Sequence, residues 1–147
     1  MSSTPEEEEL AWSVARAMFD RDAASQALGM HIVSMGPGQA VLEMTVRPDM
    51  VNGHQICHGG MIFALADSAF AFACNSRDRV AVAAGCSIEF IAPARLGERL
   101  AASATEQARS GRSGVYDVRV TNGAAQTVAL LRGRSRERDE SVRGIAT

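Results

Sequence analysis

The segment Asn52–Ser76, NGHQICHGGMIFALADSAFAFACNS, constrains the fold more than any other part of the chain. After Gly60 its composition predicts a strongly apolar helix, yet Asp67 and Ser68 lie in the middle of it. Burying an unpaired carboxylate costs several kcal/mol or forces it to bind a proton. Asp67 therefore has either structural hydrogen-bonding partners or a functional role, and the residue alone does not favour one over the other.

Length and composition indicate one folded domain over residues 1–147. Apolar residues make up 46% of the chain and charged residues 22%, which is typical of a globular protein. The net charge of −2 gives no basic surface for nucleic acid, so we expect no nucleic-acid partner. Because the chain contains no lysine, any cationic contact to a phosphate would come from arginine.

The cysteines and the N-terminus favour a cytoplasmic protein. Three cysteines, at positions 57, 74 and 86, form neither a disulfide framework nor a zinc motif. The N-terminal MSSTPEEEELAW lacks the basic and apolar regions of an export signal. The apolar run from Met61 to Cys74 is shorter than the ~20 residues that a bilayer requires, so we expect no membrane partner.

Hydrophobic patterning predicts an α+β domain. Thr4 can cap an N-terminal helix within residues 1–24 that ends near Asp22, and Asn122-Gly123 is typical of a β-hairpin. Strand patterns cover residues 28–35, 39–47, 80–91, 98–109, 114–122 and 126–138. We expect the last four strands to form a meander, the antiparallel sheet to wrap the central helix, and residues 139–147 to form a disordered tail.

His58-Gly59-Gly60 lies where a loop becomes the central helix. First-turn amides of a helix have no internal partners and carry partial positive charge, so they suit a developing oxyanion. Two glycines also occur in ordinary tight turns, and for this pair alone the turn is the commoner explanation.

The spacing between Asp67 and Gly60 predicts a shared site. Seven helical residues separate them by roughly 10 Å along the axis, too far for both to act on one carbonyl. Two antiparallel copies of the helix in a homodimer would bring Asp67 of one chain beside the glycine amides of the other.

Other polar residues near this segment have ordinary structural explanations. Asn52 is typical of a turn, and His58 of a helix start. His31 and His54 belong to no constellation. A thiol nucleophile at Cys57 lacks an indicated supporting carboxylate, and we predict no metal site because recognisable ligand spacing is missing.

The same residues carry a family resemblance. The string NGHQICHGG…LADSAFAFACNS resembles the PaaI-type hotdog-fold acyl-CoA thioesterases of phenylacetate catabolism, and the likeness runs from about Ala11 to Ser135. It includes Gly114-Val115-Tyr116-Asp117 and the strand around Thr127–Ser135. The resemblance implies a hotdog fold that dimerises through its sheet.

The resemblance also implies residue roles. Asp67 would act as general base on water or attack the thioester carbonyl itself, while Gly59 or Gly60 would donate its amide to the thioester oxygen. Asn52 would hold the water or the carbonyl, and His58 would support the helix opening. Some related enzymes place the water with a serine on the following strand. Val82–Gly85 has none there, so Ser68 or Ser87 would substitute.

The implied substrate is phenylacetyl-CoA or a ring-hydroxylated relative, which supplies CoA itself and requires no cofactor. Phe63 and other apolar residues near the central helix would contact the acyl group. Arginines that could meet the CoA phosphates are Arg77, Arg95, Arg132 and Arg134. We expect a homodimer at minimum and a homotetramer as the complete assembly.

Two other functions fit a hotdog domain. One is a non-catalytic protein that binds acyl-CoA, although the chain has no room for an output module such as a DNA-binding helix. The other is hydration or dehydration of an acyl thioester, which His58 makes conceivable.

Overall fold

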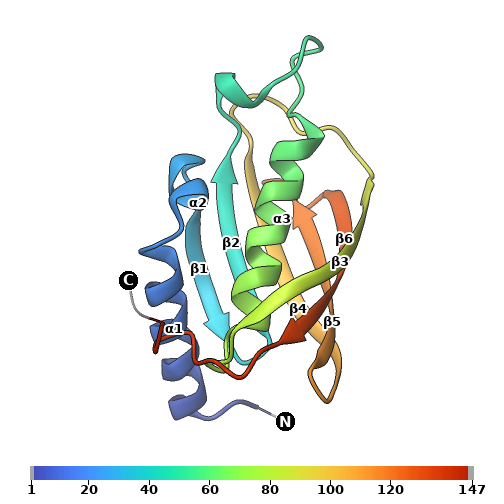
Figure 1. Ribbon diagram of the computed structural model, residues 1–147. Coiled ribbons are helices and arrows are strands. Elements are labelled where there is room, and N and C mark those ends of the chain that lie inside the picture. The colour runs from blue at the N-terminus through green and yellow to red at the C-terminus, as the bar shows by residue number, and fades with distance from the viewer. Residues whose placement is uncertain (1, 146–147) are drawn as a thin grey trace.

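The computed structural model describes residues 2–145 as one antiparallel sheet with a helix across it, which confirms the α+β prediction (Figure 1). The strand order is β1-β2-β4-β5-β6-β3. The helices are α1 (Pro5–Phe19), α2 (Ala23–Ala27) and α3 (Gly59–Cys74), with a 3-10 turn at Pro48–Met50. The strands are β1 (His31–Gly36), β2 (Gln39–Thr45), β3 (Ala81–Phe90), β4 (Arg99–Ser110), β5 (Ser113–Thr121) and β6 (Thr127–Glu137).

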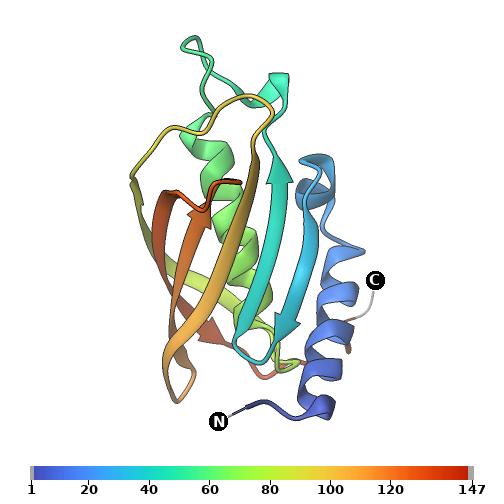
Figure 2. The ribbon, with the colours of Figure 1, turned by 180° about the vertical axis from the view of Figure 1, so that it is seen from behind.

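The core lies between α3 and one face of the sheet. Leu65, Phe70 and Phe72 of α3 are fully buried. Phe70 packs on β6, where a side chain at Gly133 would come within 2.7 Å of the ring. Burying such aromatic surface supplies much of the folding free energy. Within the described residues, the opposite face of the sheet carries no helix (Figure 2).

The two edges of the sheet differ in their cover. Helix α1 packs along the edge strand β1, whereas β3 forms the other edge with most of its residues exposed. The meander prediction is right for β4, β5 and β6 but wrong for β3, which pairs with β6 rather than β4. An exposed edge of ten residues offers unpaired backbone groups to another chain.

Local hydrogen bonds explain where two predicted elements end. Thr4 caps α1, as expected, by accepting from the Glu7 amide at 3.2 Å. The helix ends at Phe19 rather than near Asp22, because Asp22 instead caps the short helix α2 by accepting from the Ser25 amide at 3.0 Å. The β5–β6 hairpin is present, but Ala125 rather than Gly123 adopts positive φ in its turn.

The C-terminal segment differs from the expected disordered tail. Val142 is buried, and the Asp78 carboxylate accepts hydrogen bonds from the Ser141 hydroxyl and the Arg143 backbone amide, both at 3.0 Å. Through Ile145 the segment is therefore held by specific contacts, while residues 146–147 lie outside the described part of the chain.

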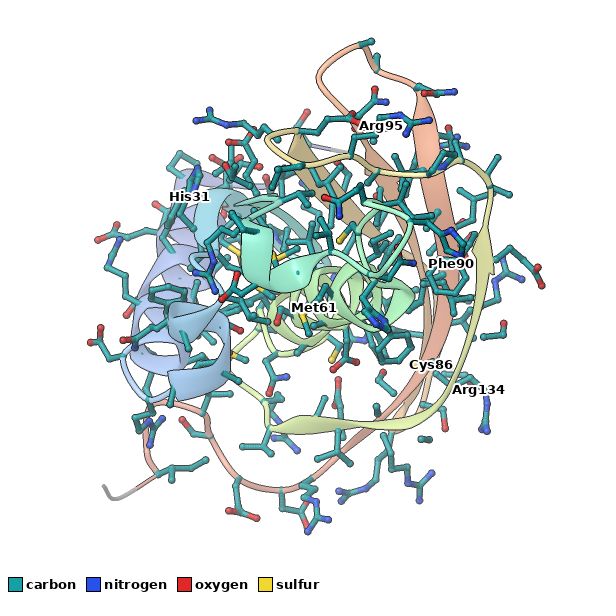
Figure 3. All side chains as sticks on the ribbon, turned by 90° about the horizontal axis from the view of Figure 1, so that it is seen from above. His31, Met61, Cys86, Phe90, Arg95 and Arg134 are labelled. Atoms are coloured by element: carbon teal, nitrogen blue, oxygen red, sulfur yellow. The ribbon has the colours of Figure 1, made fainter. Side chains whose placement is uncertain are left out.

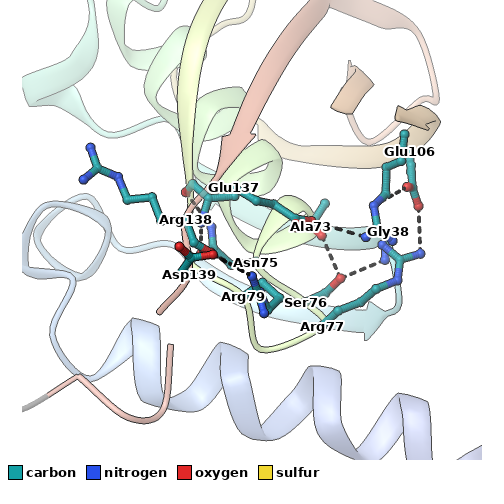
Figure 4. A network of polar contacts seen from close by, with 12 residues as sticks. Gly38, Ala73, Asn75, Ser76, Arg77, Arg79, Glu106, Glu137, Arg138 and Asp139 are labelled. Carbon is teal, nitrogen blue, oxygen red and sulfur yellow. Dashed lines mark hydrogen bonds and ion pairs between the residues drawn. The ribbon is translucent and has the colours of Figure 1, made fainter. Parts of the chain in front are cut away.

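Asn75 ties the C-terminal end of α3 to the sheet. Its buried side-chain nitrogen donates to the carbonyls of Ala71 at 2.8 Å and Ala81 at 3.1 Å, and its oxygen accepts from the Ala81 amide at 2.9 Å. Beside it, the Ser76 hydroxyl donates to Ala73 and accepts from the Gly38 amide (Figure 4). These bonds hold α3 in one position against β3.

We expect Asn75→Ala to lower the free energy of unfolding by about 2–4 kcal/mol, because the buried backbone groups of Ala81 would lose their partner. Urea denaturation at one protein concentration measures the change. The matched control is Asn122→Ala, which removes exposed turn bonds and should cost within about 1 kcal/mol. Equal losses in the two variants would contradict this role of Asn75.

Candidate active site

The loop before α3 is tied to the rest of the domain and presents the N-terminus of the helix outward. The His58 amide donates to the Met50 carbonyl at 2.8 Å, and the Cys57 amide donates to Ala94 at 2.7 Å. His58 occupies the N-cap position, is exposed and makes no side-chain capping bond. The first-turn amides, including those of Gly59 and Gly60, therefore remain available to a ligand.

The two glycines lie in different surroundings. A side chain at Gly59 would come within 3.1 Å of the Phe90 ring, so packing within the chain accounts for this glycine. At Gly60 a side chain would meet nothing within 4 Å, and the residue is exposed. Nothing in the described chain requires glycine at position 60, and its backbone is open to close approach by a ligand or a second chain.

An apolar pocket of about 550 Å³ opens beside this helix end. Gly59, Asn52, Ile62 and Phe90 contribute to its walls, together with Ile56, Cys57 and Ile91–Pro93. Phe63, the expected acyl contact, does not line this pocket and packs partly buried against the core. Figure 3 looks onto this end of the molecule and shows Phe90 beside α3, with His31 on the far side. Sequence patterning missed Phe90 because strand residues on either face look alike.

Asn52 shapes the loop and borders the pocket. Its side-chain oxygen accepts from the His54 amide at 2.9 Å and from Ile56 at 3.4 Å, as expected of a turn residue. These bonds use the oxygen and orient the side-chain nitrogen, which is the group that could donate to a ligand.

Asp67 lies about two turns further along α3, half-buried in a second cavity of about 230 Å³. Burial raises the pKa of its carboxyl group, and the negative charge of Asp22 raises it further. No ion pair with Asp67 occurs in the part of the chain that the structure describes. A carboxyl group destabilised in its charged form and facing a cavity is typical of an acid-base site.

Ser68 lines the same cavity and belongs to a chain of hydrogen bonds. Its hydroxyl lies 2.8 Å from that of Ser25, and Ser25 donates to the Asp22 carboxylate at 2.6 Å. Asp22 and Ser25 were missed as site residues. The cap motif Asp22-Ala23-Ala24-Ser25 signals a helix start but gives no sign that α2 meets α3.

The two serines expected to position the water, Ser68 and Ser87, lie on different sides of the sheet. Ser87 lines a groove on the face of the sheet that α3 does not cover, together with Arg132 and Thr105, so it is wrong as a partner for Asp67. Its neighbour Cys86 pairs with Gly133 on the helix side of the sheet. Of the two serines proposed, only Ser68 shares a cavity with Asp67.

The four arginines occupy different parts of the molecule. Arg77 pairs with Glu106 at 2.8 Å beyond the C-terminal end of α3. Arg132 donates from Nε and Nη2 to the two oxygens of Asp117 on the open sheet face. Arg134 is exposed on that same face beside Gly85 (Figure 3). Arg95 alone pairs, through its backbone, with Ile56 in the loop that precedes α3.

The remaining reactive groups are not arranged for chemistry. Burial raises the pKa of the Cys57 thiol, which disfavours the nucleophilic thiolate. His31 contacts Glu43 at 3.0 Å, on the far side of the molecule from Phe90.

Over residues 2–145, no three His, Cys, Asp or Glu side chains group as metal ligands. Over the same residues, no helix has the length and hydrophobicity needed to span a membrane.

Comparison with known proteins shows the family to which the chain belongs. Residues 54–129, which contain Gly59, Gly60 and Asp67, match the family model described as the thioesterase superfamily. The chain is 47% identical to the acyl-coenzyme A thioesterase PaaI of Escherichia coli K12 over 136 residues, which cover 92% of this chain and 97% of that protein.

Solved structures show the same fold. The E. coli PaaI protein from the phenylacetic acid degradation operon superimposes with a TM-score of 0.91 at 46% identity, covering 92% of this chain and 98% of the other. The smu.793 protein of Streptococcus mutans UA159, solved with acetyl CoA bound, gives 0.73 at 26% identity over 76% and 90% of the two chains. The chain therefore belongs to the thioesterase superfamily, and within it to the PaaI-type hotdog-fold thioesterases.

Proposed function

We propose that the protein is an acyl-CoA thioesterase in which Asp67 acts as general base on water. The observation that carries the proposal is that α3 bears both an uncapped N-terminus at Gly59-Gly60 and a half-buried Asp67 that faces a cavity without an ion-pair partner among the described residues. Such groups match the two needs of thioester hydrolysis, a stabilised oxyanion and an activated water.

The site is completed by a second chain. Gly59 packs against Phe90, and burial together with the nearby charge of Asp67 raises the pKa of the Cys86 thiol, so α3 runs beside the exposed edge strand β3. Antiparallel pairing of β3 with its copy would place two α3 helices antiparallel on one face of a continuous sheet. Each Asp67 would then approach the Gly60 amide of the partner, where the chain leaves open space.

The reaction follows from these positions. Asp67 accepts a proton from water as the water oxygen bonds to the thioester carbonyl carbon, and the glycine amides stabilise the negative charge on the carbonyl oxygen. The tetrahedral intermediate then collapses to the free acid and expels the CoA thiolate, which takes up a proton. His58 supports this step only through its backbone, since its side chain makes no bond at the helix end.

We propose phenylacetyl-CoA or a ring-hydroxylated relative as substrate. The pocket of about 550 Å³ between Asn52 and Phe90 is apolar and of a size that suits an aromatic acyl group. The similarity to the E. coli PaaI protein, which comes from the phenylacetic acid degradation operon, supports the same substrate class. Arg95 is the arginine best placed to meet a CoA phosphate, because its backbone forms an isolated bridge with Ile56 in the loop before α3. The reaction needs no cofactor beyond the CoA of the substrate.

Asp67→Asn should lower kcat for phenylacetyl-CoA by roughly a thousandfold or more, because the amide cannot accept the proton of water. Thiol release measures turnover, while circular dichroism and size-exclusion chromatography check that fold and assembly persist. Wild-type turnover in this variant would contradict the role of Asp67. Tight binding of the ester by the wild-type protein without thiol release would instead indicate a non-catalytic binder, and addition of water to an enoyl-CoA would indicate a hydratase.

We expect kcat/KM to fall as the pH drops through the raised pKa of Asp67. This fall should occur at a higher pH than the value of about 4 at which an ordinary carboxyl group titrates. The stability should change in the opposite direction. Because the folded state holds the Asp67 proton more tightly than the unfolded state, the stability that Asp67 contributes is present below its unfolded pKa and is lost as the pH rises through its folded pKa.

Asp67→Asn removes this penalty, so the variant should melt at a higher temperature than the wild type at pH 7, with the difference shrinking at acid pH. Thermal denaturation at a series of pH values measures both trends. A variant less stable than the wild type at pH 7 would show that Asp67 is a structural carboxylate with favourable partners.

A further inference from the structure

The structure assigns Asp22 and Ser25 of the α2 region a positioning role: through a directional hydrogen-bond chain they hold the Ser68 oxygen as an acceptor for the water that Asp67 activates. This inference rests on the proposed thioesterase function. The chain consists of three contacts in a row: Ser68 to Ser25 at 2.8 Å, Ser25 to Asp22 at 2.6 Å, and the Ser25 amide to the second Asp22 oxygen at 3.0 Å.

The direction of the chain follows from which groups carry protons. An ionised carboxylate can only accept hydrogen bonds, so the Ser25 hydroxyl donates its one proton to Asp22. The Ser25 oxygen can then only accept from Ser68, and the Ser68 proton is directed away from Asp67. The lone pairs of Ser68 that remain can accept a hydrogen bond in the cavity it shares with Asp67.

Two acceptors side by side orient a water molecule. Asp67 and Ser68 both line the cavity of about 230 Å³, which has room for more than one water of about 30 Å³ each. A water that donates one proton to each acceptor has its oxygen lone pairs turned away from both, toward an incoming carbonyl. If Ser68 were a donor instead, it would compete for the lone pair that must attack.

The burial of Ser25 distinguishes this arrangement from ordinary helix capping. Capping of α2 needs only the Asp22 oxygen that accepts from the Ser25 amide. Ser25 is 2% exposed and its side chain bridges from α2 to α3, so its hydroxyl orders a residue of the active-site helix. A serine in the middle of a helix commonly points to solvent or bonds back to its own helix backbone, whereas Ser68 contacts Ser25.

The test compares kcat and KM for phenylacetyl-CoA in Asp22→Asn and Ser25→Ala, at a pH on the plateau of the wild-type profile so that Asp67 ionisation does not contribute. In Asp22→Asn the amide still caps α2 through its oxygen, but its nitrogen donates to Ser25 and reverses the chain. In Ser25→Ala the chain is broken. We expect kcat to fall roughly 10- to 100-fold in both variants, with KM within about twofold of wild type.

Ser76→Ala is the matched control, because it removes another buried serine hydroxyl, just past the C-terminal end of α3 and outside the cavity of Asp67. It should lose stability but keep wild-type kcat. Wild-type kcat in both Asp22→Asn and Ser25→Ala would overturn the inference. So would losses of kcat that appear only together with loss of fold, or equal losses in Ser76→Ala.

Failure of this inference is distinguishable from failure of the proposed function. Wild type and Asp67→Asn are assayed in parallel with the same ester. Absence of thiol release from wild type refutes the thioesterase proposal and the positioning role with it. Normal wild-type release that Asp67→Asn abolishes and the two α2 variants preserve refutes only the positioning role.

Discussion

The rigidity of α3 determines how this protein can work. A helix keeps Gly60 and Asp67 roughly 10 Å apart whatever the sheet does beneath it. The helix itself is held at its C-terminal end by Asn75 and Ser76, and along its length by Phe70 against Gly133. In the proposed mechanism its two chemical groups therefore meet across a symmetry axis, for which the long exposed edge of β3 offers a surface.

The position of Asp67 on this helix raises the free energy of its charged form. Partial burial and the nearby charge of Asp22 both disfavour its ionised form, so the carboxylate is a stronger proton acceptor than a solvated aspartate. This environment costs stability in the folded state and benefits only a reaction that takes up a proton. Ser25 and Ser68 form a chain of hydroxyl groups that runs from the Asp22 carboxylate to the cavity that Ser68 shares with Asp67.

Features carried by a single segment were predictable from the sequence. A few neighbouring residues are enough to recognise each of them: Asp67 within an apolar helix, the glycines at the start of that helix, and the Thr4 cap. Features made by distant segments were not. Strand β3 pairs with β6, although β4 and β5 lie between them in the sequence. Spacing alone suggested a meander instead.

The choice between Ser68 and Ser87 shows the same limit at the site. Both serines follow Asp67 in the sequence, but the pairing of β3 turns Ser87 to the open face while Cys86 faces the helix. Likewise, Val142 and Ile145 belong to a polar tail without periodicity, and only contacts with Asp78 and Arg21 show that it is held in place. Long-range pairing decides such cases, and one-dimensional patterns do not contain it.

Complementation between two inactive variants tests the shared site most directly. Asp67→Ala lacks the base, and Gly60→Val should obstruct the open space at the helix end. If each site takes Asp67 from one chain and Gly60 from the other, unfolding and refolding an equal mixture should restore roughly a quarter of wild-type thiol release, since half of the random dimers carry one intact site. A refolded mixture that assembles normally but stays as inactive as its parents would contradict a site shared between chains.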